Sequence, residues 1–280
     1  MLLENPLVDI SGVDPLREPG FGWDPSAEVR IGISGADGSS SLAYHATLPP
    51  GAARLRHVNR NCDELLVYLE GTGIAGQAGG LARIRQGHCQ FVPKGVEHFF
   101  KNTSAQEKTV ILGFCPGAPD FAASGFEARA AVREEELRLP EKPFGAGLLV
   151  HLDAVGPAAM NEKDGWLISD FRIPIGRFNG SSSALFHPRF LPGAIHKKHR
   201  HLNCEEIYYL TAGEGVAGAG RDRVRIHGGQ FHFVPKGVEH FLSNHSKTDP
   251  IEGFGVYIGA GSVEETGYQY TGEVGAEDLV

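Results

Sequence analysis

Hydrophobic and polar residues alternate over short distances along most of the chain, and Gly, Pro or Asn ends each run. The clearest runs, rich in β-branched and aromatic residues, are 183–192 (SALFHPRFLP), 205–215 (EEIYYLTAGEG), 222–235 (DRVRIHGGQFHFVP) and 239–244 (EHFLSN). A period of two is typical of β-strands, and strong helical periodicity is absent from these segments. Many short strands joined by glycine-rich turns predict an all-β sandwich or barrel, the jelly roll among them.

The same pattern occurs twice at a fixed offset. Gly51 and Gly193 are 142 residues apart (193 − 51), and residues 38–102 align with 180–244 without a gap, with about 29 of the 65 positions identical. A period of this length corresponds to a whole domain rather than to a short structural repeat. We therefore expect tandem domains at 1–126 and 151–280, with a linker at 127–150 in which AAVREEELRL could form a short helix.

Composition narrows the class of protein. The 280 residues carry a formal net charge of −8, and no basic block is present, which argues against a nucleic-acid partner. No window approaches 18 consecutive apolar residues, so we expect no membrane partner. The first twelve residues lack the basic and apolar regions of a signal peptide, and the four cysteines form no CxxC pair. We therefore expect a cytoplasmic protein with reduced thiols.

The strongest chemical signal is the stretch HKKHRHLNCEE at 196–206. Because side chains alternate along a strand, His199 and His201 should share a face, together with Lys197. Two imidazoles side by side suit one divalent ion, and a carboxylate follows at Glu205 or Glu206. The opposite interpretation is that these groups are only the polar residues of a strand.

The spacing of these residues resembles the two motifs of the cupin family, and the resemblance covers both copies of the repeat. The first motif, G-x5-H-x-H-x4-E-x6-G, is met by Gly193, His199, His201, Glu206 and Gly213. The second motif, G-x5-P-x-G-x2-H-x3-N, is met by Gly229, Pro235, Gly237, His240 and Asn244. The six-residue spacing to Gly213 favours Glu206 over Glu205.

The resemblance implies two tandem jelly-roll barrels and, in the second barrel, one divalent ion held by His199, His201, Glu206 and His240. Three imidazoles and one carboxylate suit Fe, Mn, Ni, Cu or Zn, and iron is our leading expectation. Four protein ligands on a six-coordinate ion would leave two positions open for water, O2 or a chelating substrate.

The first copy departs from the motif at one position, because Asn59 stands where His201 stands in the second copy. His57, Glu64 and His98 remain, which is a two-histidine, one-carboxylate set. The first barrel could therefore hold a second ion as an occupied triad or a weak site, or it could be a relic that keeps the fold.

Three further residues are candidates for catalysis. Tyr208 shares the face of Glu206 and could donate a proton, unless it is a core aromatic residue. His187, matched by His45 in the first copy, could line the pocket or lie on a strand surface. Lys197 could meet an anionic substrate at the barrel mouth or be an ordinary exposed lysine.

The family resemblance is more informative about fold and metal than about reaction. Our leading expectation is an enzyme, a non-haem Fe(II) dioxygenase acting on a small chelating aromatic, enol or keto-acid substrate. The alternatives are a redox-neutral isomerase, cyclase or decarboxylase, and a non-catalytic bicupin that binds a small ligand. A homodimer is expected from the family resemblance alone.

Overall fold

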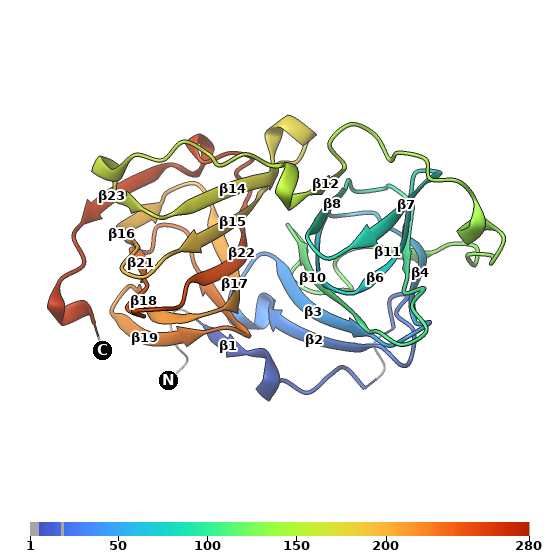
Figure 1. Cartoon of the computed structure of the whole chain (residues 1–280), viewed down its shortest axis with the longest axis horizontal. Helices are drawn as coiled ribbons and strands as arrows, with labels where there is room; N and C mark the ends of the chain where they lie inside the picture. Colours follow the sequence, from blue (N-terminus) through green and yellow to red (C-terminus); the bar gives the residue numbers. More distant parts are fainter. Residues whose placement is uncertain (1–5, 18–19, 280) are drawn as a thin grey trace. The chain divides into compact units, whose positions relative to one another are not determined.

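The computed structural model describes residues 6–17 and 20–279, which form two compact units, each built around its own core. We name them by the repeat that each contains. The C-terminal barrel comprises residues 6–12, 37–39 and 155–279, and the N-terminal barrel comprises residues 13–17, 20–36 and 40–154. Both are all-β, as the alternating pattern predicts (Figure 1).

The C-terminal barrel consists of two antiparallel sheets. In one sheet the order is β1 (Leu7–Asp9), β20 (Gln230–Val234), β17 (Glu205–Ala212), β22 (Ile251–Ile258), β15 (Ala184–Phe190) and β14 (Asp170–Ile175). In the other it is β13 (Trp166–Leu167), β16 (Ile195–His201), β21 (His240–Ser243), β18 (Glu214–Ala219) and β19 (Asp222–His227), with β23 (Tyr268–Gly272) also paired to β16.

The N-terminal barrel repeats this arrangement. One sheet has the order β12 (Leu149–His151), β8 (His88–Val92), β5 (Glu64–Glu70), β10 (Thr109–Cys115), β3 (Leu42–Leu48) and β2 (Glu28–Ile33). The other has the order β11 (Phe126–Ala128), β4 (Ala53–Asn59), β9 (His98–Lys101), β6 (Thr72–Gln77) and β7 (Gly80–Arg85). Thus β4, β5 and β9 correspond to β16, β17 and β21 of the other barrel.

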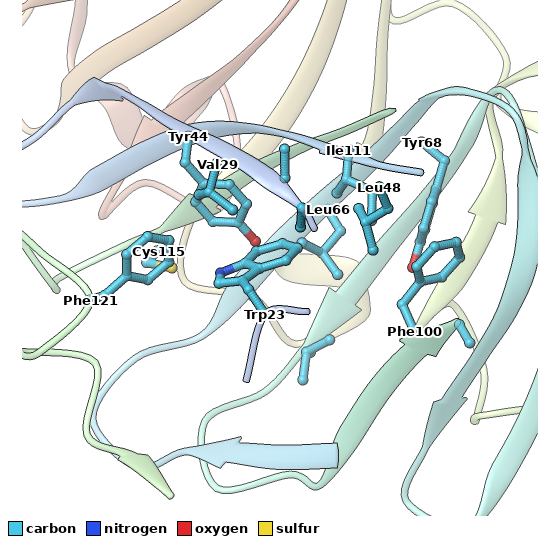
Figure 2. Close-up of a cluster of buried hydrophobic side chains, with 14 of the residues drawn as sticks. Trp23, Val29, Tyr44, Leu48, Leu66, Tyr68, Phe100, Ile111, Cys115 and Phe121 are labelled. Carbon is cyan, nitrogen blue, oxygen red and sulfur yellow. The ribbon is translucent and has the colours of Figure 1, made fainter. Parts of the chain in front are cut away.

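A hydrophobic core fills the space between the sheets of each barrel. In the C-terminal barrel Phe171, Phe186 and Tyr257 extend from one sheet toward Ala217 and Ile226 of the other. Figure 2 shows the corresponding core of the N-terminal barrel. Each fully buried phenylalanine contributes about 1.5–3 kcal/mol relative to an exposed one, so this packing sets the frame on which polar groups are placed.

The glycine that ends the first motif is required for steric reasons in both barrels. Gly213 has φ +82°, and a Cβ there would lie 2.2 Å from the Pro250 carbonyl oxygen. Gly71 has φ +79° and meets the Lys108 carbonyl oxygen at the same distance. Because a β-carbon fits neither this backbone conformation nor the space, the turn after β5 and β17 requires glycine.

The domain boundaries differ from those expected from the sequence. Strand β1 lies in the first expected domain but pairs with β20 of the C-terminal barrel, whereas β11 and β12 belong to the N-terminal barrel. The stretch 127–150 is therefore largely part of a barrel rather than a linker. Residues 1–5, 18–19 and 280 of the expected domains lie outside the described residues.

No α-helix occurs in the described residues. The expected helix at 130–139 is reduced to one 3₁₀ turn, Glu136–Arg138. The other 3₁₀ turns are Ile10–Gly12, Gly35–Asp37, Leu152–Ala154, Glu162–Asp164, Arg177–Asn179, Glu264–Thr266 and Ala276–Asp278. Accordingly, none of the described segments forms a helix long and apolar enough to cross a membrane. The four cysteines are buried and free of disulfides, in line with the expectation of reduced thiols.

Candidate metal centre

Four side chains predicted as ligands meet inside the C-terminal barrel. His199 and His201 extend from β16, Glu206 from β17 and His240 from β21, and all four are buried. One nitrogen or oxygen atom from each lies within 4.8 Å of the others. Glu206 Oε2 is 3.1 Å from both His201 Nε2 and His240 Nε2. The structure therefore brings together a compact set of three imidazoles and one carboxylate.

The turn before β21 positions His240 beside the other three residues. Val238 N donates to the Pro235 carbonyl at 3.2 Å, and Gly237, with φ +80°, donates its N–H to the His201 carbonyl at 2.8 Å. At the other end of β21, Asn244 Nδ2 donates to the Phe190 carbonyl at 2.8 Å. The second motif thus anchors both ends of a four-residue strand, which fixes the direction of the His240 ring.

The choice between the two glutamates follows from strand alternation. Glu206 points to the three histidines, whereas Glu205 points the other way and accepts a hydrogen bond from Ser39 Oγ at 3.1 Å. A shift by one residue moves a side chain to the opposite face of a strand. The placement agrees with the motif spacing, which favoured Glu206.

The orientation of the rings fits a metal ion. His199 Nδ1 and His240 Nδ1 face the carbonyl oxygens of Lys197 at 2.6 Å and Val238 at 3.0 Å, so their Nε2 atoms carry the free lone pairs. Among the described residues, the buried His199 Nε2 has no hydrogen-bond partner, and His201 Nε2 has only the Glu206 carboxylate beside it. Buried polar atoms normally have a partner, and a divalent ion bound by these nitrogens and Glu206 would provide it.

The electrostatics of the set also suit a cation. Burial, followed by the neighbouring imidazoles, lowers the pKa of His199 well below its usual range, so its ring is neutral near pH 7. Burial alone would raise the pKa of Glu206, but hydrogen bonding and attraction from His201 and His240 outweigh it and leave the pKa lowered. Neutral imidazole and ionised carboxylate are the forms that bind transition metals.

A β-bulge adds a histidine that the sequence pattern does not place here. The register between β16 and β21 shifts between His196 and His199, so an extra residue is inserted. His196 therefore turns inward, where its ring centre lies 3.7 Å from that of His199, and no described residue forms a hydrogen bond with its Nε2. Strict alternation predicts Lys197 on this face, but its Nζ instead pairs with Glu273 Oε1 at 2.8 Å.

A mostly apolar pocket adjoins the four residues. Its described lining includes His196, His199, Glu206, Tyr208 and His240, and the rest is mainly Ile168, Phe171, Phe186, Phe190, Leu210, Leu242, Phe254 and Tyr257. None of these lining residues is a lysine or an arginine. A second cavity of about 460 Å³ is lined by Trp166, Phe171 and Tyr268, among others. Phe171 belongs to the lining of both cavities.

The three residues proposed for catalysis from sequence have different surroundings. Tyr208 lines the pocket, and its hydroxyl is 2.6 Å from Nδ1 of the buried His232. His187 lies outside the described lining, although its strand neighbours Phe186 and Pro188 belong to it, and its ring packs on Phe254 at 4.8 Å. His187 and Lys197 thus face away from the pocket, and Tyr208 remains. Burial lowers the pKa of His232 to about 4.

The N-terminal barrel places His57, Glu64 and His98 in the same way. One ligand atom from each lies within 4.8 Å of the others, and all three residues are buried. His98 Nε2 is 2.8 Å from Glu64 Oε2. Asn59, at the position of His201, turns its amide nitrogen toward the same oxygen at 3.4 Å. Groups whose spacing could hold a metal ion therefore occur in both barrels.

One residue distinguishes the N-terminal set. Arg54 Nη1 donates to Glu64 Oε1 at 2.5 Å and to the Tyr44 hydroxyl at 2.7 Å, and the arginine is only 4 % exposed. Tyr44 in turn donates to the same carboxylate oxygen at 2.7 Å. Burial would raise the pKa of Glu64, but the attraction of Arg54, followed by that of His98, holds it well below its usual range.

Comparison with known proteins agrees with the repeat. A family model described as a cupin domain matches residues 44–114 and again residues 186–257. A search of the curated proteins gives no match.

Solved structures of oxalate decarboxylase from Bacillus subtilis share the fold. A variant with one tryptophan replaced by tyrosine has a TM-score of 0.68 at 14% identity, covering 91% of this chain and 78% of that chain. A variant with one arginine replaced by alanine has a TM-score of 0.67 at 14% identity, and the match covers 91% of this chain and 77% of that chain. A third structure of that enzyme, with the same coverage, identity and TM-score as the arginine variant, is titled for its Mn(II) centres. At this identity the likeness establishes the fold.

Proposed function

The chain belongs to the cupin family, whose domain it contains twice, and on this premise we propose that its C-terminal barrel is the active site of a metal-dependent enzyme. One observation carries the proposal. His199, His201, Glu206 and His240 converge beside an apolar pocket, and the buried Nε2 of His199 has no hydrogen-bond partner among the described residues. A binding module that uses only shape has no need of such a set.

The donor set indicates a first-row transition metal. Neutral imidazoles with one carboxylate suit Fe(II) and Mn(II), whereas oxygen-only sites suit Mg and Ca. We propose Fe(II) first and Mn(II) second, the latter because a neighbour in fold is described by its Mn(II) centres. The bound ion would supply a Lewis acid with open positions for the chelating oxygen atoms of a substrate and for O2.

The pocket suggests the kind of substrate. Its wall is made mainly of aromatic and aliphatic side chains, and its described lining offers no fixed cation. A substrate with an apolar or aromatic body and one small chelating group fits this wall better than a small dianion, which would lack a cationic partner away from the metal. The pocket itself has a volume of about 30 Å³, so the substrate body would need the cavity of about 460 Å³ beside Trp166 and Tyr268, reached by a movement of Phe171, which lines both.

Tyr208 and His232 are the groups of this chain that are best placed to handle a proton. The tyrosine lines the pocket, and its hydroxyl contacts the buried imidazole of His232 at 2.6 Å. Burial and the nearby Glu206 raise the pKa of Tyr208 well above its usual range, so the phenol stays protonated. The pair can therefore hold a proton at the pocket wall and orient the polar end of a substrate by hydrogen bonding.

For the reaction we propose O2-dependent dioxygenation, in which both oxygen atoms enter the product. Decarboxylation is the second candidate and is favoured by the fold likeness to oxalate decarboxylase. In that reaction CO2 leaves and a proton takes its place on carbon, a step for which Tyr208 is suitably placed.

Oxygen dependence separates the two reactions. The purified protein, reconstituted with Fe(II) or Mn(II), should be assayed for O2 uptake on a panel of small aromatic, enol and keto acids, with His199→Ala as the inactive control. Dioxygenation predicts O2 consumption equal to product formed and no turnover under anaerobic conditions. Turnover that continues without O2 and releases CO2 would replace dioxygenation by decarboxylation.

A further inference from the structure

Arg54 and His196 occupy the same position in the two barrels. They are 142 residues apart (196 − 54), which is the offset of the repeat. Each pairs with a tryptophan on the neighbouring segment, Arg54 with Trp23 and His196 with Trp166. Each also precedes a register shift that turns its side chain into the barrel. At this one structural position the N-terminal barrel thus has a permanently charged guanidinium and the C-terminal barrel an imidazole.

The surroundings of Arg54 are built for a cation. Its guanidinium carbon lies 4.4 Å from the ring centre of Trp23, 5.7 Å from that of Tyr44 and 5.9 Å from that of Phe121. Figure 2 shows these three aromatic residues gathered in the N-terminal core, with the hydroxyl of Tyr44 directed toward Trp23. Aromatic faces attract a cation, and a desolvated contact of this kind is among the strongest.

The same guanidinium neutralises the carboxylate that a metal would need. Glu64 Oε1 accepts hydrogen bonds from Arg54 and Tyr44, and Oε2 faces His98 and Asn59. A divalent ion bound here would lie next to a fixed buried positive charge, which opposes it strongly where water is excluded. In the C-terminal barrel the equivalent position holds the imidazole of His196, which stacks on His199, instead of a guanidinium paired with the carboxylate.

We propose that Arg54 takes the place of a metal ion in the N-terminal barrel, so that this barrel binds no divalent ion and each chain binds one. The expected metal does not fit this set because of charge rather than because of missing donors. His57 Nε2 is buried and has no hydrogen-bond partner in the part of the chain that the structure describes, so two imidazoles and a carboxylate are still in place. The residue paired with the tryptophan, Arg54 in one barrel and His196 in the other, therefore decides whether that barrel binds a metal.

Metal content measures this inference independently of any activity. The double variant His199→Ala/His201→Ala removes the C-terminal donors, and it should be equilibrated with Mn²⁺, separated from free metal and analysed for bound manganese. We expect one equivalent in the wild-type chain and about zero in the double variant. One equivalent remaining in the double variant and lost on adding His57→Ala would overturn the inference.

A reciprocal exchange tests whether Arg54 is the cause. Arg54→His alone should give the double variant one equivalent of Mn²⁺, because the donors His57, Glu64 and His98 are already in place. In the opposite direction, His196→Arg in the wild-type chain should abolish Mn²⁺ binding, and His196→Gln should retain it. Circular dichroism establishes that each variant is folded. A folded His196→Arg variant that retains its manganese would contradict the role given to this position.

Discussion

Glu206 on β17 and His240 on β21 approach to 3.1 Å, although their strands belong to different sheets of the C-terminal barrel. His199 and His201 lie on the same sheet as His240. An ion bound by these residues would therefore connect the two sheets, and its binding energy would stabilise the folded barrel.

Metal binding should raise the stability of the chain. At a free Mn²⁺ concentration 100 times the Kd, the gain is about 2.7 kcal/mol. For a chain of this size, each kcal/mol of added stability raises the Tm by roughly 2–4 °C. Calorimetry with and without Mn²⁺ measures this rise. The double variant His199→Ala/His201→Ala serves as the control and should show no shift. An equal shift in that variant would place the stabilising ion elsewhere.

The two barrels should respond differently to loss of their glutamate. Glu64→Gln leaves the buried Arg54 without its counter-charge, and we expect a loss of roughly 3–5 kcal/mol in the free energy of unfolding. In the metal-free protein, Glu206→Gln leaves no fixed cation without a counter-charge. It should lower the free energy of unfolding by about 1 kcal/mol or less. Urea denaturation of both variants in the presence of a chelator measures the difference. Similar losses in the two would contradict the assignment of Arg54.

Removal of the Tyr208 hydroxyl should affect turnover without affecting the metal. If this group delivers or holds a proton, Tyr208→Phe lowers kcat by roughly 10²–10⁴-fold while the chain keeps its ion. Tyr68→Phe is a matched control, because it removes another buried tyrosine hydroxyl, bonded to Gln90 at 2.7 Å, from the N-terminal barrel. Unchanged kcat in Tyr208→Phe would remove the tyrosine from the mechanism.

Acid should weaken the attachment of the C-terminal segment to the barrel. Asp278 Oδ2 lies 2.6 Å from Lys198 Nζ, and Oδ1 lies 2.7 Å from Arg223 Nη2. Burial raises the pKa of Asp278, but hydrogen bonding to Lys198 and to Gly275 N, followed by Arg223, outweighs it and lowers the pKa to about 2.

The direction of this pH dependence follows from linkage. A carboxyl whose pKa is lower in the folded state stabilises it fully above its unfolded pKa of about 3.9, and the stabilisation is lost as the pH falls toward 2. Asp278→Asn should therefore reduce the free energy of unfolding at pH 7 and pH 5, and by less at pH 3. A difference between the variant and the wild type that is constant over this range would show that the charge of Asp278 is not involved.

The fold and the ligand positions could be predicted from sequence for physical reasons. Turn glycines such as Gly213 are required by the backbone conformation and by a close contact. The spacing between them therefore indicates how long the intervening strands are. The same spacing places Glu206, rather than Glu205, on the inner face. The offset of 142 residues then transfers each position to the other barrel.

The inward direction of His196 and Arg54 could not be predicted in this way. Periodicity assumes strict alternation, whereas each residue precedes a bulge that inserts one residue and turns it inward. The same bulge explains why Lys197 faces outward. The choice between the two positions considered for His187 could not be made from sequence, because alternation alone does not say which face of β15 is the pocket face. The pairing of β1 with β20 and of β12 with β8 joins segments distant in sequence, which local patterns do not encode.

The most direct test of the account is to locate the metal by anomalous diffraction from crystals grown with Mn²⁺. We predict one anomalous peak for each chain, within about 2–2.3 Å of nitrogens of His199, His201 and His240 and of an oxygen of Glu206, and none beside Glu64. Absence of a peak at the C-terminal residues, or an equal peak next to Glu64 and Arg54, would contradict it.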